Sequence, residues 1–115
     1  MEIDRGFLGR LLADDLKSMG FDQESGDEVV EALCEATLEY LPELRRAVAG
    51  AAGMSEISFF AHALKGTFNN FSAPQFISLA DLFQTMEKEA KTTGSLEVVT
   101  DLMTQVEGEL KVWIN

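Results

Sequence analysis

The chain has 115 residues, which favours a single domain and leaves too little for a two-lobed nucleotide enzyme. It is 46% hydrophobic and 25% charged, as in ordinary globular proteins. The net charge of −11 argues against nucleic acid and anionic membrane surfaces as partners, because both attract Lys and Arg. The start at Met1 shows no signal peptide, and no apolar run approaches the roughly 18–20 residues of a membrane span. With Cys34 as the single cysteine, we expect a cytoplasmic protein.

The first half of the chain has helical periodicity and almost no strand signal. A first helix is predicted from Asp4 to Met19, ending at Gly20. A second is predicted from Ser25 to Ala49, and Pro42 inside it predicts a kink. Residues 49–53 are expected to form a loop.

The second half of the chain predicts three more helices. The third runs from Ser55, a plausible N-cap, to Phe71. The fourth begins at Pro74, a good first-turn residue, and ends before Gly94. The fifth runs from Leu96 to Trp113. Helices two to five (residues 25–113) are expected to pack as an antiparallel up-down four-helix bundle, with the short N-terminal helix (residues 1–20) capping one end of a single domain, residues 1–115.

The third predicted helix is strongly amphipathic and carries the only histidine, His62. At about 100° per residue, the far side from His62 holds Ile57, Phe60, Leu64, Thr67, Phe68 and Phe71. Its own side holds Ser55, Ser58, Lys65, Gly66, Asn69 and Ala73. His62 is therefore expected on the solvent face.

The interval around His62 contains no acidic residue between Glu56 and Asp81, and Lys65 is its only charge at neutral pH. This pattern fits either a helix buried on several sides or a surface kept free of negative charge so that an anion can bind. Lys65 and Gly66 lie one turn from His62. Lysine offers a cation to phosphate oxygens, whereas a mid-helix glycine costs about 1 kcal/mol relative to alanine and is explained if another molecule approaches closely.

The segment His62-Ala63-Leu64-Lys65-Gly66-Thr67, followed by Asn70-Phe71-Ser72-Ala73, resembles the HxLKG core of histidine phosphotransfer (HPt) domains. The next helix, with Phe76, Leu79-Ala80 and Met86-Glu87, is similar too. The resemblance covers about Glu28 to Leu110. Two departures concern packing more than chemistry: Ser72 stands where the family often has glycine, and Phe68 where a small residue is common.

The resemblance implies a role for several residues. His62 would be phosphorylated through its outer ring nitrogen, Lys65 would steady the phosphoryl group, and Gly66 would leave room for the partner. Gln84, with Lys88 one turn on, matches a polar position that some members use. The partner-binding surface would be the strip around His62, comprising Ser58, Phe59, Asn69 and Lys88.

The implied partners are the receiver domain of a response regulator, a hybrid sensor kinase, or both. The implied function is a phosphoryl carrier without kinase activity of its own, since the chain has no Walker-type loop and no kinase motif set. We expect a monomer without cofactor or metal; Mg²⁺ would belong to the receiver. Two alternatives stay open: the phosphoacceptor domain of a chemotaxis-type kinase, which the length and start at Met1 disfavour unless the chain was excised, and a helical module that binds a receiver without carrying phosphate. A hydrolase using His62 as general base is disfavoured, because no acid or nucleophile occupies a helical neighbour position.

Overall fold

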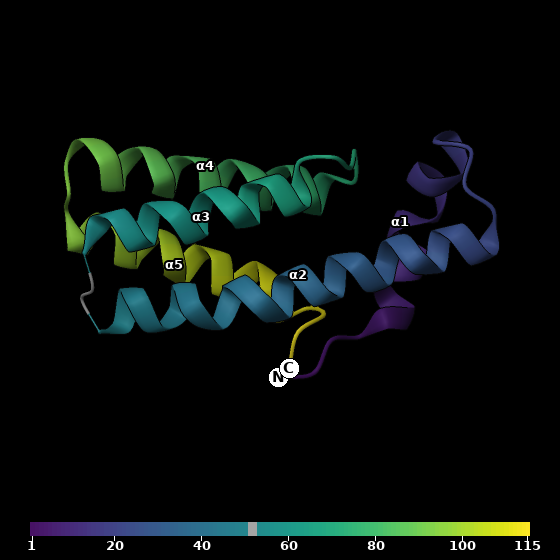
Figure 1. Ribbon diagram of the computed structural model, residues 1–115, viewed down its shortest axis with the longest axis horizontal. Coiled ribbons are helices and arrows are strands. Elements are labelled where there is room, and N and C mark those ends of the chain that lie inside the picture. Colours follow the sequence, from purple (N-terminus) through teal and green to yellow (C-terminus); the bar gives the residue numbers. More distant parts are fainter. Residues whose placement is uncertain (51–52) are drawn as a thin grey trace.

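The computed structural model describes residues 1–50 and 53–115, and within these ranges its regular secondary structure is helical apart from one isolated bridge. The helices are α1 (Arg5–Ser18), α2 (Gln23–Ala49), α3 (Met54–Phe68), α4 (Pro74–Thr92) and α5 (Leu96–Leu110). Helices α2 to α5 alternate in direction and lie side by side, which confirms the all-α antiparallel bundle (Figure 1). The predicted loop at 49–53 partly falls on residues 51–52, outside the described residues. None of the described helices combines the length and apolarity that crossing a bilayer requires.

An aromatic cluster joins α3, α4 and the end of the chain in the core. The Phe68 ring lies 5.1 Å from that of Phe76 and 5.9 Å from that of Phe83, between centroids. Trp113 lies 6.0 Å from both Phe68 and Phe76. The predicted helical end at Trp113 is wrong, because α5 ends at Leu110 and a turn then directs the indole into the core. These contacts fix α3 against α4.

The ends of α3 differ from the prediction. Ser55 is not the N-cap: the helix begins at Met54, with Gly53 at the cap and no side-chain cap bond, so Ser55 already lies in the first turn. The helix also stops at Phe68 rather than Phe71. The start of α4 at Pro74 is confirmed, and proline disfavours helical backbone in Ala73, which has non-helical backbone as the N-cap of α4.

Helix α2 begins two residues before its predicted start and is continuous to Ala49. The Asp22 carboxylate caps it by accepting the backbone N–H of Ser25 at 2.8 Å. The helix continues through Pro42 without a break. The first half of α2 extends beyond the other three helices of the bundle (Figure 1).

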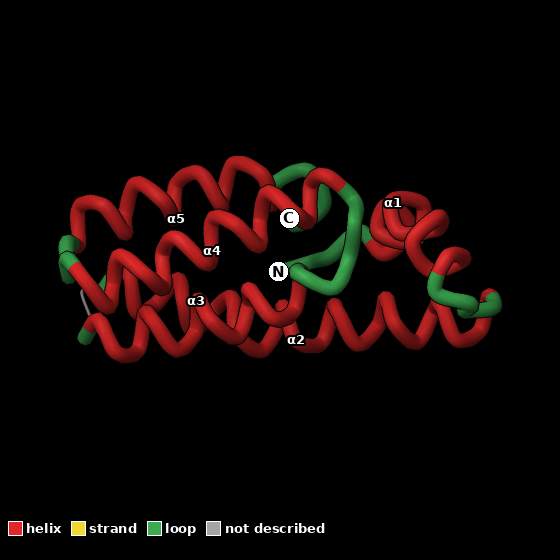
Figure 2. The backbone as a smooth tube through the Cα atoms, turned by 90° about the horizontal axis from the view of Figure 1, so that it is seen from above, coloured by secondary structure: helices red, strands yellow, loops and turns green. Residues whose placement is uncertain are grey.

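Helix α1 lies across one end of the bundle, against the projecting half of α2 (Figures 1 and 2). Leu8, Leu12 and Leu16 are its buried face. The Asp15 carboxylate of α1 caps α4, which is distant in sequence. It accepts hydrogen bonds from the backbone N–H groups of Ser72 at 3.0 Å and Ala73 at 3.1 Å, and from the Ser72 hydroxyl. Helix α4 has no cap from its own N-cap residue, so α1 supplies one.

This cap predicts that α1 stabilises the bundle through one side chain. Asp15→Ala should lower the free energy of unfolding by about 1–2 kcal/mol, the usual cost of losing a helix cap. Asp14→Ala is the control, because it removes the same charge from an exposed neighbour. Urea unfolding followed by circular dichroism measures both. Equal stability of the two variants would contradict the capping role.

Candidate functional site

His62 lies in the middle of α3 with 63% of its side chain exposed, which confirms its predicted place on the solvent face. On the opposite side of the helix Ile57, Leu64 and Phe68 are fully buried. Packing therefore holds the helix, while the imidazole projects from it into solvent.

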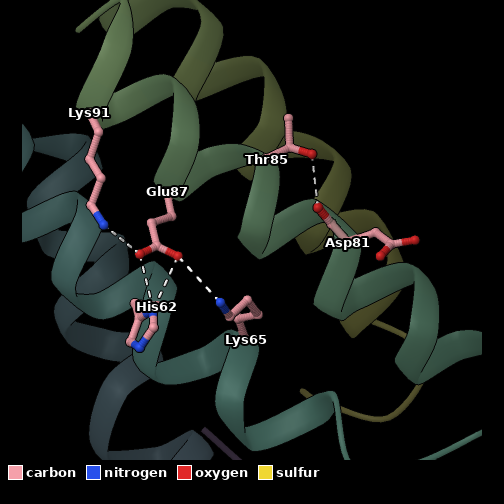
Figure 3. Close-up of polar contacts among 6 residues, drawn as sticks. All are labelled: His62, Lys65, Asp81, Thr85, Glu87 and Lys91. Atoms are coloured by element: carbon pink, nitrogen blue, oxygen red, sulfur yellow. Dashed lines mark hydrogen bonds and ion pairs between the residues drawn. The ribbon is translucent and has the colours of Figure 1, made fainter.

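A carboxylate from the neighbouring helix holds the imidazole. Glu87 of α4 places its oxygens 3.0 and 3.1 Å from Nδ1 of His62 (Figure 3). The Glu87 side chain is only 12% exposed. Of the two interpretations of the acid-free interval, a surface free of negative charge therefore holds for α3 alone, because α4 places the Glu87 carboxylate beside His62.

Sequence reasoning missed Glu87 because periodicity relates His62 only to side chains of its own helix, and because the resemblance pointed to Gln84 and Lys88 on the next helix instead. A signal was present in α4: the apolar positions Phe76, Leu79, Ala80, Phe83, Met86 and Ala90 form its buried face. Glu87 adjoins that face and is itself buried. A carboxylate at a core-facing position needs a partner, because burying an unpaired charge is costly. That requirement points to a partner on an adjacent helix.

Two lysines complete the cluster around Glu87. The Lys91 ammonium lies 2.8 Å from Oε2, and the Lys65 ammonium lies 3.7 Å from Oε1 (Figure 3). The pKa of Glu87 is lowered from its ordinary value, chiefly by the hydrogen bond from Lys91; burial opposes this, and the His62 contact adds to it. Glu87 is therefore ionised at neutral pH.

This geometry assigns different tasks to the two ring nitrogens. An ionised carboxylate only accepts hydrogen bonds, so Nδ1 of His62 must carry the hydrogen that it donates to Glu87. In the neutral ring the lone pair is then on Nε2. Figure 3 shows that this second nitrogen points away from Glu87. The site thus presents an oriented, exposed nucleophilic nitrogen.

The other predicted site residues on α3 differ in how far they are exposed to solvent. Lys65 is 24% exposed and is directed towards Glu87. Gly66 is exposed, and a Cβ added there would meet no atom within 4 Å, so close packing within the chain does not explain this glycine. Phe59 is 62% exposed and Asn69 is exposed. Ser58 lies on the same face but is buried, with 6% exposure, because it faces the α4 side chains rather than solvent.

Gln84 and Lys88 of α4 are both exposed, and among the described residues neither makes a hydrogen bond or ion pair with His62. The residue of α4 that contacts the imidazole is Glu87, which Lys91 contacts in turn. Those two residues lie three positions further along α4 from Gln84 and Lys88 respectively. A one-turn offset along the antiparallel helix is not visible from motif spacing alone.

A mostly apolar groove adjoins His62 on the side towards the start of α3. It is lined by Met54, Ser55, Ser58, Phe59, His62, Glu87, Ala90 and Lys91. The exposed ring of Phe59 forms part of this groove next to the imidazole. A partner that reaches Nε2 would therefore meet an apolar surface beside it.

Fold and site together define a helical bundle that presents one oriented histidine nitrogen to solvent. The family model of the Hpt domain matches residues 28–111, and the chain belongs to this family of histidine phosphotransfer domains of two-component phosphorelays. Helix α1 lies outside the matched range. The comparisons with curated proteins and with solved structures found no match.

The lowered pKa of Glu87 predicts a pH-dependent contribution to stability. A carboxyl with a lower pKa in the folded state stabilises the fold above its ordinary value of 4.5, and this contribution is lost as the pH falls through the folded-state pKa. Glu87→Gln should lower the free energy of unfolding by about 1 kcal/mol at pH 7.

Urea titrations of both proteins between pH 3 and pH 7 measure the effect. The difference between parent and Glu87→Gln should shrink below pH 4.5. Glu28→Gln, at an exposed position on α2, controls for the loss of one charge. A difference that does not change with pH would show that Glu87 acts through packing alone.

Proposed function

We propose that the chain accepts a phosphoryl group on Nε2 of His62 and passes it to the aspartate of a response-regulator receiver domain. One observation carries the proposal: the ring is held through Nδ1 by Glu87, while Nε2 faces solvent. A histidine with no role has no need of a buried carboxylate to orient it. Family membership adds the class of reaction, histidine phosphotransfer.

The nucleophile of the transfer would be the positioned Nε2 of His62. The Nε2 lone pair attacks phosphorus, the bond from phosphorus to the donor oxygen breaks, and that oxygen leaves with the electron pair. Positive charge then develops on the ring, and the Glu87 carboxylate at Nδ1 stabilises it. Lys65, on the same face one turn along, supplies a cation for the phosphoryl oxygens. Attack on this phosphorus by a receiver aspartate reverses the sequence.

The metal for this reaction is proposed to come from the partner. Among the described residues no three potential ligands lie close enough together to hold a metal ion. Phosphoryl transfer depends on positioning and on neutralising charge at the phosphoryl oxygens. The receiver, with its aspartate and Mg²⁺, would supply most of that neutralisation, and this chain would supply the nucleophile.

The surface around His62 is proposed to be the docking surface. Gly66 leaves the backbone one turn from the imidazole uncovered, and Phe59 offers an exposed apolar contact on the other side. A docking surface alone would also suit a module that binds a receiver without carrying phosphate; the imidazole held by Glu87 favours the phosphoryl carrier. The same chemistry would serve the phosphoacceptor domain of a larger kinase.

His62→Gln should abolish phosphate acceptance and leave the bundle folded, because the side chain is largely exposed and no other histidine exists in the chain. The parent should acquire a label that is acid-labile and base-stable, as phosphoramidates are. Incubation with a phosphorylated receiver, followed by acid and base treatment, tests this. Acid-stable label, or label on the substituted protein, would overturn the proposal.

Gly66→Gln should slow exchange with a receiver sharply without destabilising the fold. A Cβ at this position meets no atom within 4 Å, and helix propensity improves by up to about 1 kcal/mol. Labelling by a small phosphodonor should continue, since it needs no docking surface.

Gly108→Gln is the matched control, because Gly108 is also exposed in a helix, on α5, and a Cβ there meets nothing within 4 Å. Thermal unfolding and receiver exchange should be measured on the same preparations. If Gly66→Gln melts early and transfers normally, the docking role of this face is wrong.

A further inference from the structure

Lys91 makes the closest charged contact in the His62 cluster, although 61% of its side chain is exposed. Its ammonium lies 2.8 Å from Oε2 of Glu87, the same oxygen that lies 3.0 Å from Nδ1 of His62. Lys65 lies further away, at 3.7 Å, and contacts the other oxygen. An exposed lysine is free to point into solvent, so its position on this oxygen requires an explanation.

The explanation lies in a conflict within the pair formed by His62 and Glu87. A carboxylate beside an imidazole orients it, but the same negative charge favours the protonated ring. A protonated ring has no lone pair on Nε2 and cannot attack phosphorus. A cation on the carboxylate relieves this conflict, because it offsets part of the charge that the ring experiences.

We propose that Lys91 is a positioning residue for phosphoryl transfer: it holds Glu87 against Nδ1 of His62 and offsets the carboxylate charge that the ring experiences. This inference rests on the proposed function. The spacing supports it, since Glu87 and Lys91 are four residues apart on one helix with the acid nearer the N-terminus, the favourable order for such a pair.

The charged groups that contact the cluster among the described residues come from two helices. Helix α3 contributes Lys65, and helix α4 contributes Glu87 and Lys91. Helix α2 packs on α3 and helix α5 packs on α4, but among the described residues neither places a charged group in hydrogen-bond or ion-pair contact with His62 or Glu87. Lys88 is exposed on the same helix as Lys91 and makes no such contact there. The offsetting charge is therefore assigned to Lys91, with Lys65 as the weaker second cation.

Lys91→Gln and Lys88→Gln form a matched pair, because each removes one positive charge from an exposed lysine of α4. His62 is the only histidine, so its ring resonances can be followed by NMR during a pH titration of the unphosphorylated protein. In Lys91→Gln the titration midpoint should move up by roughly half a pH unit relative to the parent. In Lys88→Gln it should move by less than about a third of that amount, because exposed charges without contact are screened.

Labelling by a small phosphodonor between pH 6 and pH 9 gives the second readout. The rate for Lys91→Gln should be about threefold below the parent at pH 6, the loss that a half-unit shift produces. It should approach the parent rate at pH 9, and Lys91→Arg should restore the parent profile.

Two results would overturn the role of Lys91: a midpoint that moves no further than in Lys88→Gln, or a loss of rate that is uniform across pH. Absence of labelling in the parent would instead overturn the proposed function. The titration midpoints would still decide whether Lys91 controls the ring, because they require no phosphate.

Discussion

The contact between Nδ1 of His62 and the Glu87 carboxylate is the interaction on which the site depends. It joins two helices, so it exists only while α3 and α4 are held in one register. The aromatic contacts of Phe68 with Phe76 and Phe83 supply that register from inside the core. Core packing on one side of α3 therefore sets the direction of the imidazole on the other side, because it places Glu87 beside Nδ1.

The cluster around His62 concentrates positive charge, although the chain as a whole is strongly acidic. A protein with net charge −11 places two of its nine cationic side chains on one buried carboxylate. Glu87 is thereby kept ionised, as the lowered pKa indicates, and its charge is shared among a ring and two ammonium groups. An incoming phosphoryl group carries negative charge of its own. A bare carboxylate at this position would repel that group, whereas a paired one orients the ring with less repulsion.

Periodicity shows which side chains share a face of each helix. The helical bundle, the exposed position of His62 and the exposed position of Gly66 could all be predicted from it. Contacts between helices could not be predicted in this way. Glu87 reaches the imidazole, and Asp15 caps α4, only because tertiary packing brings distant segments together. Some helix ends were predicted wrongly for a related reason. Ser55 has the chemistry of an N-cap, yet α3 begins one residue before it.

The most direct test of this account is the position of protons and phosphate on the His62 ring. Two-bond ¹H–¹⁵N correlation spectra of the unphosphorylated protein at pH 8 should show the neutral tautomer with hydrogen on Nδ1, held by Glu87. After labelling, phosphorus coupling should appear on Nε2. Hydrogen on Nε2 in the free protein, or phosphate on Nδ1 in the labelled one, would contradict the account.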